Sequence, residues 1–455
     1  MTPTAATAFR LGAWSSTTGY PSAGTFYQQR LLAANTNDQP QTWWASQTSD
    51  FENHTPDDLS GTVEDDDALD YTISADDVDA IRWLSAGKGQ LAIGTVGGEW
   101  TVTSTGSVIT PSDVVVDPAT SHGSANIRAL RIGNIVLFVQ RALRKVREFG
   151  FDFQVDGFQA FDMMRLAEHV TRGGLIEMDY AEEPNALVWT VRADGQMPSM
   201  TFRREEDVVG WARHIIGGSF STGAAVVESV VVIPGANGSG QTQSSENRDE
   251  VWITVKRTID GATKRYIEVL EADWDASYDQ EDAYYSDSLI TYDGAAASTI
   301  AGLDHLEGET VKILADGAIH PDRTVASGQI TLDAGYSVVQ IGLGYTHTFK
   351  TLKLIAGTVA GTPVGKTKQI FGVTFVLLNA HTLAFGPDAS NLRKIDFRTV
   401  ADTMDNAVPY FTGEHFEEWD DDWGTDPRMV ISSDDAAPFG LLALVPETEV
   451  REVRG

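Results

Sequence analysis

The chain has 455 residues, with 33 Lys or Arg against 65 Asp or Glu, which gives a formal net charge of −32. A chain this acidic is not expected to coat itself with nucleic acid, because phosphate contacts need clusters of Lys and Arg. It has no cysteine, which excludes disulfides, iron–sulfur clusters, Cys-type zinc sites and thiol catalysis.

The N-terminal stretch MTPTAATAFRLGAW lacks the basic region and the apolar run of a signal peptide. No window of the sequence approaches about 18 consecutive apolar residues, the length that spans a membrane as a helix. We therefore expect neither a signal peptide nor a membrane-spanning helix.

Strand–turn–strand patterns dominate the chain. Such units occur at 28–46, 89–104, 133–153, 186–205 and 372–388. From residue 28 to 246 they begin roughly 45–65 residues apart, which is about one propeller blade with its loops. We therefore predict a mainly β fold, with a propeller-like set of antiparallel blades.

Negative charge is concentrated in VEDDDALDYTISADDVDAI, residues 63–81, and in EEWDDDW near the C-terminus. Neither stretch has the alternating aspartates and central glycine of an EF-hand loop. Three interpretations stay open: a solvated acidic face, loops that take a calcium ion from two sides, and an acidic channel or interface shared between subunits. The candidate channel-lining residues are Glu64, Asp65, Asp66, Asp67, Glu417, Glu418, Asp420, Asp421 and Asp422.

The one basic concentration is QRALRKVREF, residues 140–149, which we predict to form a hairpin tip. A salt-bridged exposed turn is the plainer interpretation. The functional interpretation is a contact with an acidic patch of a neighbouring subunit. The residues that would make it are Arg141, Arg144, Lys145 and Arg147.

One helix is predicted, over DMMRLAEHVTRGG, residues 162–174. Its apolar face would consist of Met163, Leu166, Ala167 and Val170, with an aspartate as N-cap and a glycine just past the end.

Asp-Gly dipeptides favour hairpins, because they tolerate the positive φ angles of type I′ turns. They occur at 156–157, 194–195, 260–261, 293–294 and 316–317. The stretch 234–249 reads as a polar Gly/Ser loop.

The sequence pattern changes from about residue 296. Short strands are predicted there, separated by His, Pro and Gly, near 310–315, 323–325, 329–332 and 338–343. We predict an inserted small β-sandwich or barrel domain at 296–355. A propeller-like domain would precede it at 1–295, and 356–455 would return to the propeller-like body with C-terminal strands.

Catalytic and cofactor motifs are incomplete or missing. GTPVGKT, residues 361–367, has three residues rather than four between its first glycine and Gly-Lys-Thr, and a strand-like sequence follows it. The histidines form no HExxH motif, and there is no Gly-x-Ser-x-Gly elbow. Sequence alone places no carboxylate pair for glycoside hydrolysis. We expect no enzymatic activity, no cofactor and no metal.

Several segments, in this order, resemble a family of short-tailed bacteriophage tail proteins described as tail nozzle or tail tubular protein B. They are PSAGTFYQQRLLAANTNDQPQTWWASQTSDFEN, AIRWL, LAIGTVGGEWTV, VLFVQRALRKVREFGFDF, LIEMDYAEEPNALVWTVRADG, KRYIEVLE, LEGETVKILADGAIHP and VPYFTGEHFEEW. The resemblance extends from about residue 18 to residue 450.

The resemblance implies a structural virion protein with a β-propeller, which assembles as a homohexameric ring below the head–tail adaptor and continues the DNA ejection channel. The implied partners are the adaptor, distal tail or fibre proteins, and DNA that passes without specific binding. The implied location is the virion tail, assembled in the host cytoplasm. An acidic wall would suit such a conduit, since it repels DNA.

Two other functions stay open. One is a receptor- or carbohydrate-binding tail protein, with or without polysaccharide depolymerase activity, in which tryptophans stack on sugars. The candidate tryptophans are Trp43, Trp44, Trp419 and Trp423. The other is a propeller scaffold of a host cell with no viral role.

Overall fold

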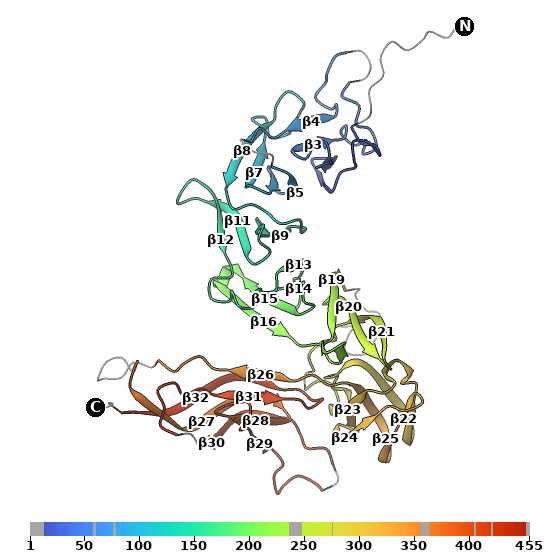
Figure 1. Ribbon diagram of the computed structural model, residues 1–455, viewed down its shortest axis with the longest axis vertical. Helices are drawn as coiled ribbons and strands as arrows, with labels where there is room; N and C mark the ends of the chain where they lie inside the picture. The colour runs from blue at the N-terminus through green and yellow to red at the C-terminus, as the bar shows by residue number, and fades with distance from the viewer. Residues whose placement is uncertain are drawn as a thin grey trace. The chain divides into compact units, whose positions relative to one another are not determined.

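The computed structural model describes residues 13–57, 61–75, 79–235, 248–274, 276–355, 364–404, 406–419 and 422–451. Antiparallel strands dominate them (Figure 1). The chain divides into two compact units: unit 1 runs to His214 and includes Ser229–Val232, and unit 2 comprises Ile215–Glu228 and the chain from Ile233 onward. Each unit is built around its own hydrophobic clusters.

The described part of unit 1 contains four four-stranded sheets, and in each one consecutive strands pair in antiparallel fashion. The first two sheets are β1 (Ala23–Tyr27), β2 (Arg30–Ala34), β3 (Thr42–Ala45) and β4 (Leu69–Thr72), then β5 (Ile81–Ala86), β6 (Leu91–Thr95), β7 (Glu99–Thr103) and β8 (Val115–Thr120). The next two are β9 (Leu130–Ile132), β10 (Ile135–Val139), β11 (Val146–Asp152) and β12 (Gly157–Asp162), then β13 (Leu175–Ala181), β14 (Leu187–Arg192), β15 (Met197–Arg203) and β16 (Val208–His214).

Consecutive sheets of unit 1 share hydrophobic cores, as propeller blades do. Trp43 and Ile81 belong to one cluster between the first and second sheets. Trp83 and Phe138 belong to a second cluster between the second and third sheets, and a third cluster joins the third and fourth sheets. The prediction of a mainly β fold with propeller-like antiparallel blades is confirmed.

The alternation of side chains along the strands explains this packing. In β3, Trp43 points into the core and stacks on Tyr71, whereas Trp44 points to the other face, where its ring meets the edge of Trp14. The Trp83 indole lies over its cross-strand partner and requires glycine at position 94, because a Cβ there would lie 2.0 Å from the indole.

Unit 2 starts with small sheets and continues with larger ones. The first are β17 (Ser219–Phe220) with β18 (Gly223–Ala224), and β19 (Val226–Pro234), β20 (Asp249–Ile259) and β21 (Ala262–Val269), where β19 also holds the four residues assigned to unit 1. Next comes a sheet with the order β22 (Asp287–Ala301), β25 (Gln329–Leu343), β23 (Thr310–Ala315) and β24 (Ala318–Thr324).

Two sheets near the C-terminus share one core and form a β-sandwich. One has the order β26 (His347–Lys350), β31 (Val430–Ser433), β28 (Thr382–Gly386) and β29 (Arg393–Asp396), and the other has β30 (Phe411–Glu418), β27 (Thr367–Ala380) and β32 (Gly440–Arg451). The predicted unit at 372–388 is therefore no hairpin, because β27 and β28 lie in different sheets.

Two Asp-Gly dipeptides form the expected two-residue hairpin turns. At 260–261 the φ angles are 49° and 68°, and at 316–317 they are 44° and 76°, so both turns have the positive angles of type I′. The prediction for 293–294 is wrong: this dipeptide lies within β22, at a register shift against β25.

The predicted helix at 162–174 is wrong. The segment folds as successive short turns, in which Ala167 and Val170 donate to carbonyls three residues earlier. Trp211 Nε1 donates to the Met163 carbonyl at 3.0 Å, and Leu166, placed on the apolar face by the prediction, is 95% exposed. Contacts with neighbouring strands override the helical pattern here.

The predicted domain boundaries also differ from the structure. A boundary at 295/296 would cut β22, which starts at Asp287, and unit 2 starts much earlier, at Ile215. The described residues after 356 do not return to the blades, because they build the sandwich around its own core.

A buried arginine organises the start of unit 2. Arg257 in β20 is fully buried. Its guanidinium pairs with both carboxylate oxygens of Glu268 and donates to the Gly217 carbonyl at 2.8 Å. The Gly217 amide in turn donates to Asp287 Oδ2 at 2.5 Å. The segment that begins unit 2 is thus fixed by two side chains from its sheets.

The substitution Asp287→Asn should stabilise unit 2 at alkaline pH. Burial raises the pKa of Asp287 to about 6, with Arg257 opposing and Glu268 adding to the rise. An acid whose pKa is higher in the folded state contributes stability at low pH and loses it as the pH rises through the folded pKa. Asparagine keeps an acceptor for the Gly217 amide, so urea unfolding at pH 8 should show a gain of about 1–3 kcal/mol, with no gain at pH 4.

The exposed Asp293 on the same strand supplies the control. Asp293→Asn should leave the free energy of unfolding unchanged within about 0.5 kcal/mol at both pH values. Equal or lower stability of Asp287→Asn at pH 8 would contradict the conclusion that the ionised Asp287 carboxylate destabilises the folded chain.

Candidate functional site

The first acidic run wraps around a buried arginine. Arg30 in β2 is 1% exposed. Its guanidinium donates to the main-chain carbonyls of Ser46, Asp65 and Asp67 at 2.7, 2.8 and 2.6 Å. Because the carbonyls of the run point inward, the carboxylates of Asp65 and Asp66 are left exposed.

Asp67 does not share that exposure. Its side chain is buried, and its carboxylate accepts from the Glu64 amide at 2.8 Å and from Gln47 Nε2 at 3.0 Å. The prediction of Asp67 as a channel-lining residue is therefore wrong, since the residue closes its own loop. Glu64 is exposed, like the two aspartates that follow it.

The second acidic run alternates between two faces of β30. Glu417 is half-buried and accepts from Arg393 and from His415 Nε2, at 2.5 and 2.7 Å. Glu418 points to the opposite face and is exposed. Asp420 and Asp421 lie outside the described residues, and Asp422 is exposed. Glu417 and Glu418 therefore cannot line one surface together.

The four basic residues of the hairpin at 140–149 also differ in their contacts, and two of them have partners within unit 1. Lys145 forms ion pairs with Asp162 and Glu168, at 2.5 and 3.4 Å. Arg147 donates to a glutamine side chain and to a main-chain carbonyl of its own sheet. Lys145 and Arg147 thus stabilise the third blade rather than a subunit contact.

Arg141 and Arg144 lie at the exposed turn between β10 and β11, with Leu143 between them. Leu143 is 37% exposed. Among the described residues, neither guanidinium has an ion-pair partner. We call Arg141, Leu143 and Arg144 the arginine tip.

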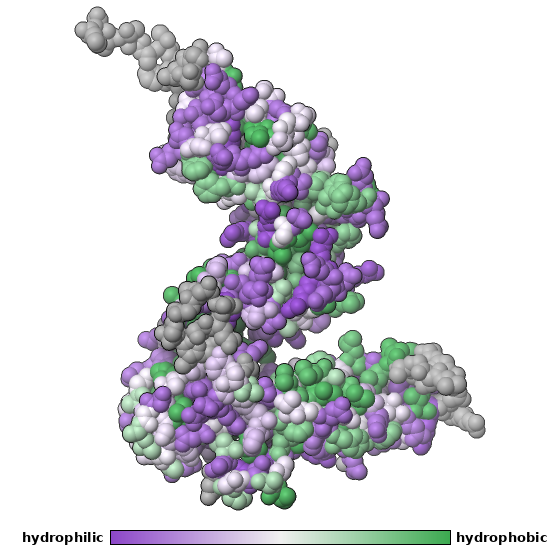
Figure 2. Space-filling model, turned by 180° about the vertical axis from the view of Figure 1, so that it is seen from behind, coloured by the Kyte–Doolittle hydropathy of each residue, from purple (hydrophilic) through white to green (hydrophobic). Residues whose placement is uncertain are grey.

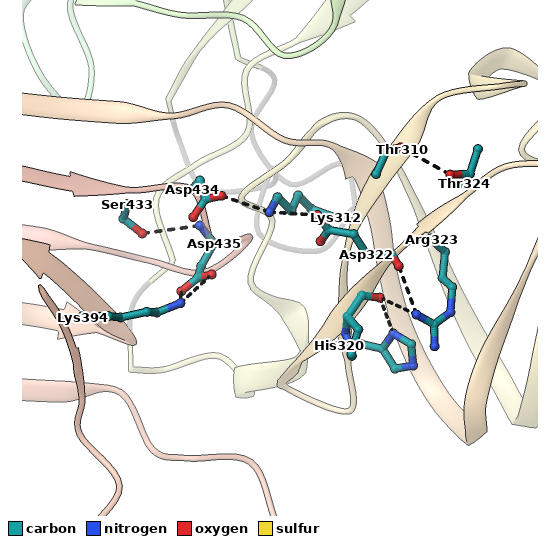
Figure 3. A network of polar contacts seen from close by, with 11 residues as sticks. Thr310, Lys312, His320, Asp322, Arg323, Thr324, Lys394, Ser433, Asp434 and Asp435 are labelled. Carbon is teal, nitrogen blue, oxygen red and sulfur yellow. Dashed lines mark hydrogen bonds and ion pairs between the residues drawn. The ribbon is translucent and has the colours of Figure 1, made fainter. Parts of the chain in front are cut away.

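A polar network joins the sheet of β22–β25 to the sandwich within unit 2 (Figure 3). Lys312 Nζ contacts Asp322 at 3.1 Å and Asp434 at 3.2 Å. The next residue, Asp435, pairs with Lys394 at 3.0 Å. Each of these carboxylates has a lysine partner, so the network is a structural cross-link.

His320 next to this network is buried, and both of its ring nitrogens lie within hydrogen-bond distance of main-chain atoms. Nδ1 lies 2.8 Å from the Pro321 carbonyl, to which only an N–H can donate, and Nε2 accepts from the Asp333 amide at 3.2 Å. Both ring nitrogens are occupied, and the bond from the Asp333 amide ties β24 to β25.

An aromatic pocket that the sequence analysis did not identify lies on the third blade. It has a volume of about 390 Å³, and its lining includes Phe151, Phe153 and Phe161. Arg204 and Glu148 pair in it at 2.7 Å, and burial raises the pKa of Glu148. The signal for this pocket was the phenylalanine-rich segment FDFQVDGFQAF.

Three of the four tryptophans considered for sugar stacking are unsuited to it. Trp43, Trp44 and Trp419 are buried at 0%, 4% and 4% exposure. Trp423 is half-buried and lies under the Arg451 guanidinium, 3.9 Å from its ring centre.

The β30–β27–β32 sheet of the sandwich exposes an unusual surface. Leu378, Phe416, Leu442 and Val445 point away from the sandwich core and are between 43% and 63% exposed. We call these four residues the apolar face. Figure 2 shows hydrophobic side chains gathered on this part of the molecule.

The described residues hold no group of three or more His, Cys, Asp or Glu that could bind a metal ion. Of the near-match to a phosphate-binding loop, residues 361–363 lie outside the described part of the chain, and the sequence after it forms β27, as expected. Within the described ranges, no helix is both long and apolar enough to cross a membrane.

No protein-family model and no curated protein matches the chain. The β-propeller domain of Cps50 (Swd1) from Myceliophteria thermophila is similar at 10% identity and a TM-score of 0.30, over 55% of this chain and 73% of that one. The extracellular domain of the putative one-component system BT4673 from B. thetaiotaomicron is similar at 10% identity and a TM-score of 0.33, over 86% of this chain and 47% of that one. A protein from Lactobacillus plantarum is similar at 13% identity and a TM-score of 0.28, over 86% of this chain and all of that one. Scores this low carry no argument about function.

Proposed function

We propose that the chain is a structural subunit of a short bacteriophage tail, and that it forms a ring, or nozzle, that continues the DNA channel below the head–tail adaptor. The observation that carries the proposal is where the family-like segments lie. LAIGTVGGEWTV forms β6 and β7, VLFVQRALRKVREFGFDF forms β10 and β11, and LEGETVKILADGAIHP forms β23 and β24. The resemblance thus follows the scaffold of both units.

Charge supports the same proposal. The exposed carboxylates of Glu64, Asp65, Asp66, Glu418 and Asp422 belong to a chain with a net charge of −32. Repeated around a homohexamer, this charge repels a passing DNA duplex, because counterion release favours basic surfaces. The proposed protein is no enzyme and needs no cofactor. Its partners are further copies, the adaptor and distal tail or fibre proteins, in a virion tail assembled in the host cytoplasm.

The test is assembly of the purified full-length chain. Mass photometry and negative-stain microscopy at physiological salt should show closed rings with a central channel, and the rings should not retain duplex DNA. Monomers at every concentration up to about 50 µM, well above typical dissociation constants of specific complexes, would contradict the proposal.

The aromatic pocket favours one alternative, a receptor- or carbohydrate-binding tail protein. Phe153 is 91% exposed at its rim, and Arg204 offers donors beside it. Titration with bacterial capsular polysaccharides decides between the two functions. We expect no saturable binding; binding that Phe153→Ala abolishes would favour the alternative.

A further inference from the structure

We propose that the apolar face of one copy binds the arginine tip of the next copy in the ring. The inference rests on the proposed function, because it needs copies that assemble head to tail. It assigns a partner to two surfaces that have none within the described chain.

The apolar face has a hydrophobic centre and an acidic margin. Phe416 in β30 and Val445 in β32 flank Thr374 of β27 in one cross-strand row. Glu418 and Glu447 flank Gly372 in the next outward row. No basic side chain of the described residues pairs with either carboxylate.

At this surface a glycine lies under the aromatic ring. A Cβ on Gly372 would lie 2.8 Å from the Phe416 ring and 3.2 Å from the Glu447 carboxylate. The ring therefore lies down on the strand instead of standing away from it. An incoming group meets the ring, a valine and two carboxylates on this face.

The edges of this sheet resist strand addition, so docking occurs on the face. Pro446 lies in edge strand β32 and has no N–H for an added strand. Arg393 covers the other edge by donating to the Glu418 carbonyl at 2.8 Å. The partner consequently approaches with side chains rather than with a free backbone.

The arginine tip has the complementary chemistry, an apolar centre between two cations, and its backbone is fixed in advance. Leu143 donates to the Gln140 carbonyl at 2.8 Å, and its own carbonyl accepts from Leu175 at 2.7 Å. The Arg144 carbonyl accepts from Thr171 Oγ1 at 2.6 Å. The backbone of a tip braced in this way loses little conformational entropy on binding.

Pairing of the apolar face with itself is disfavoured, because it would place carboxylates opposite carboxylates. Contact with the arginine tip joins two different surfaces of identical chains. Such heterologous contacts generate rings when the rotation closes. Charge complementarity therefore selects the tip of a second copy as the occupant.

Charge reversal tests the pairing in the full-length chain. The tip variant Arg141→Glu/Arg144→Glu and the face variant Glu418→Lys/Glu447→Lys should each weaken assembly by about 10-fold or more in sedimentation velocity. The combined variant should recover most of the wild-type assembly, since opposite charges again face each other. The inference would be overturned if the tip variant and the face variant each assembled normally. It would also be overturned if the combined variant assembled no better than either of them.

Cross-linking supplies a readout that does not depend on stable rings. The chain has no cysteine, so Leu143→Cys and Val445→Cys proteins can be mixed and treated with a short bis-maleimide. A heterodimeric product should form well above that from Leu143→Cys with Val400→Cys, a control at a fully exposed position. A yield no higher than the control, in rings or in monomers, rejects the contact.

The two proposals fail in distinguishable ways. Rings without the Leu143–Val445 cross-link would reject this contact and keep the nozzle. Absence of both rings and cross-link would reject both. A cross-link in open chains of copies would retain the contact and count against a closed nozzle.

Discussion

Replacing Arg257 with methionine should lower the free energy of unfolding of unit 2 by about 3–5 kcal/mol. Methionine fits the volume of the aliphatic stem but leaves Glu268, whose side chain is 16% exposed, as a largely covered charge without its cation. It also removes the donor to the Gly217 carbonyl. The loss of one partner of a buried pair costs more than the pair contributes, because the remaining charge keeps its desolvation penalty.

Urea unfolding followed by hydrogen exchange would measure the effect, because exchange separates the amides of the two units. Arg265→Met is the matched control: Arg265 pairs with Glu228 but is 58% exposed, so its loss should cost about 1 kcal/mol or less. The double variant Arg257→Met/Glu268→Gln should lose less than the single variant, since both charges are gone. A single variant within 1 kcal/mol of wild type would show that water solvates this site.

Short apolar strand patterns separated by turns were enough to predict the blades. A strand that packs between two sheets is buried on both faces and gives a continuous apolar run, as in β6 and β10, whose residues are all buried. The prediction of a helix at 162–174 was wrong because the same spacing of apolar residues also fits a series of turns. The polar groups of those turns bind neighbouring strands. The prediction of a hairpin turn at 293–294 was wrong because Asp-Gly is found in β-bulges as well as in turns.

The candidate surfaces were less predictable, because exposure depends on contacts far apart in sequence. Nothing in the run at 64–67 distinguishes buried Asp67 from its exposed neighbours, since its partner Gln47 lies in a distant loop. The same holds for Lys145 and Arg147 beside the exposed Arg141 and Arg144. The apolar face was invisible because it needs three strands in register, and the sequence does not state which strands pair.

Replacing Arg30 with leucine should lower the free energy of unfolding of unit 1 by about 3 kcal/mol, because several carbonyls lose their donor at once. The guanidinium reaches Ser46, Asp65 and Asp67 from a fully buried position, so leucine leaves polar atoms facing an apolar side chain. Amide exchange should rise selectively at 61–69, since this loop is held by Arg30 and by Asp67. Urea unfolding with exchange mass spectrometry measures both effects.

Arg30→Lys should give an intermediate loss, because an ammonium has three donors but lacks the planar fork that spans two carbonyls. Arg128→Leu, at an exposed position of unit 1, is the control and should stay within about 0.5 kcal/mol of wild type. Unchanged exchange at 61–69 in Arg30→Leu would mean that Asp67 and Gln47 suffice to hold the loop. If the loop is released instead, the main chain that carries Glu64, Asp65 and Asp66 loses its fixed position, and the conformation of the first acidic run depends on a single buried arginine.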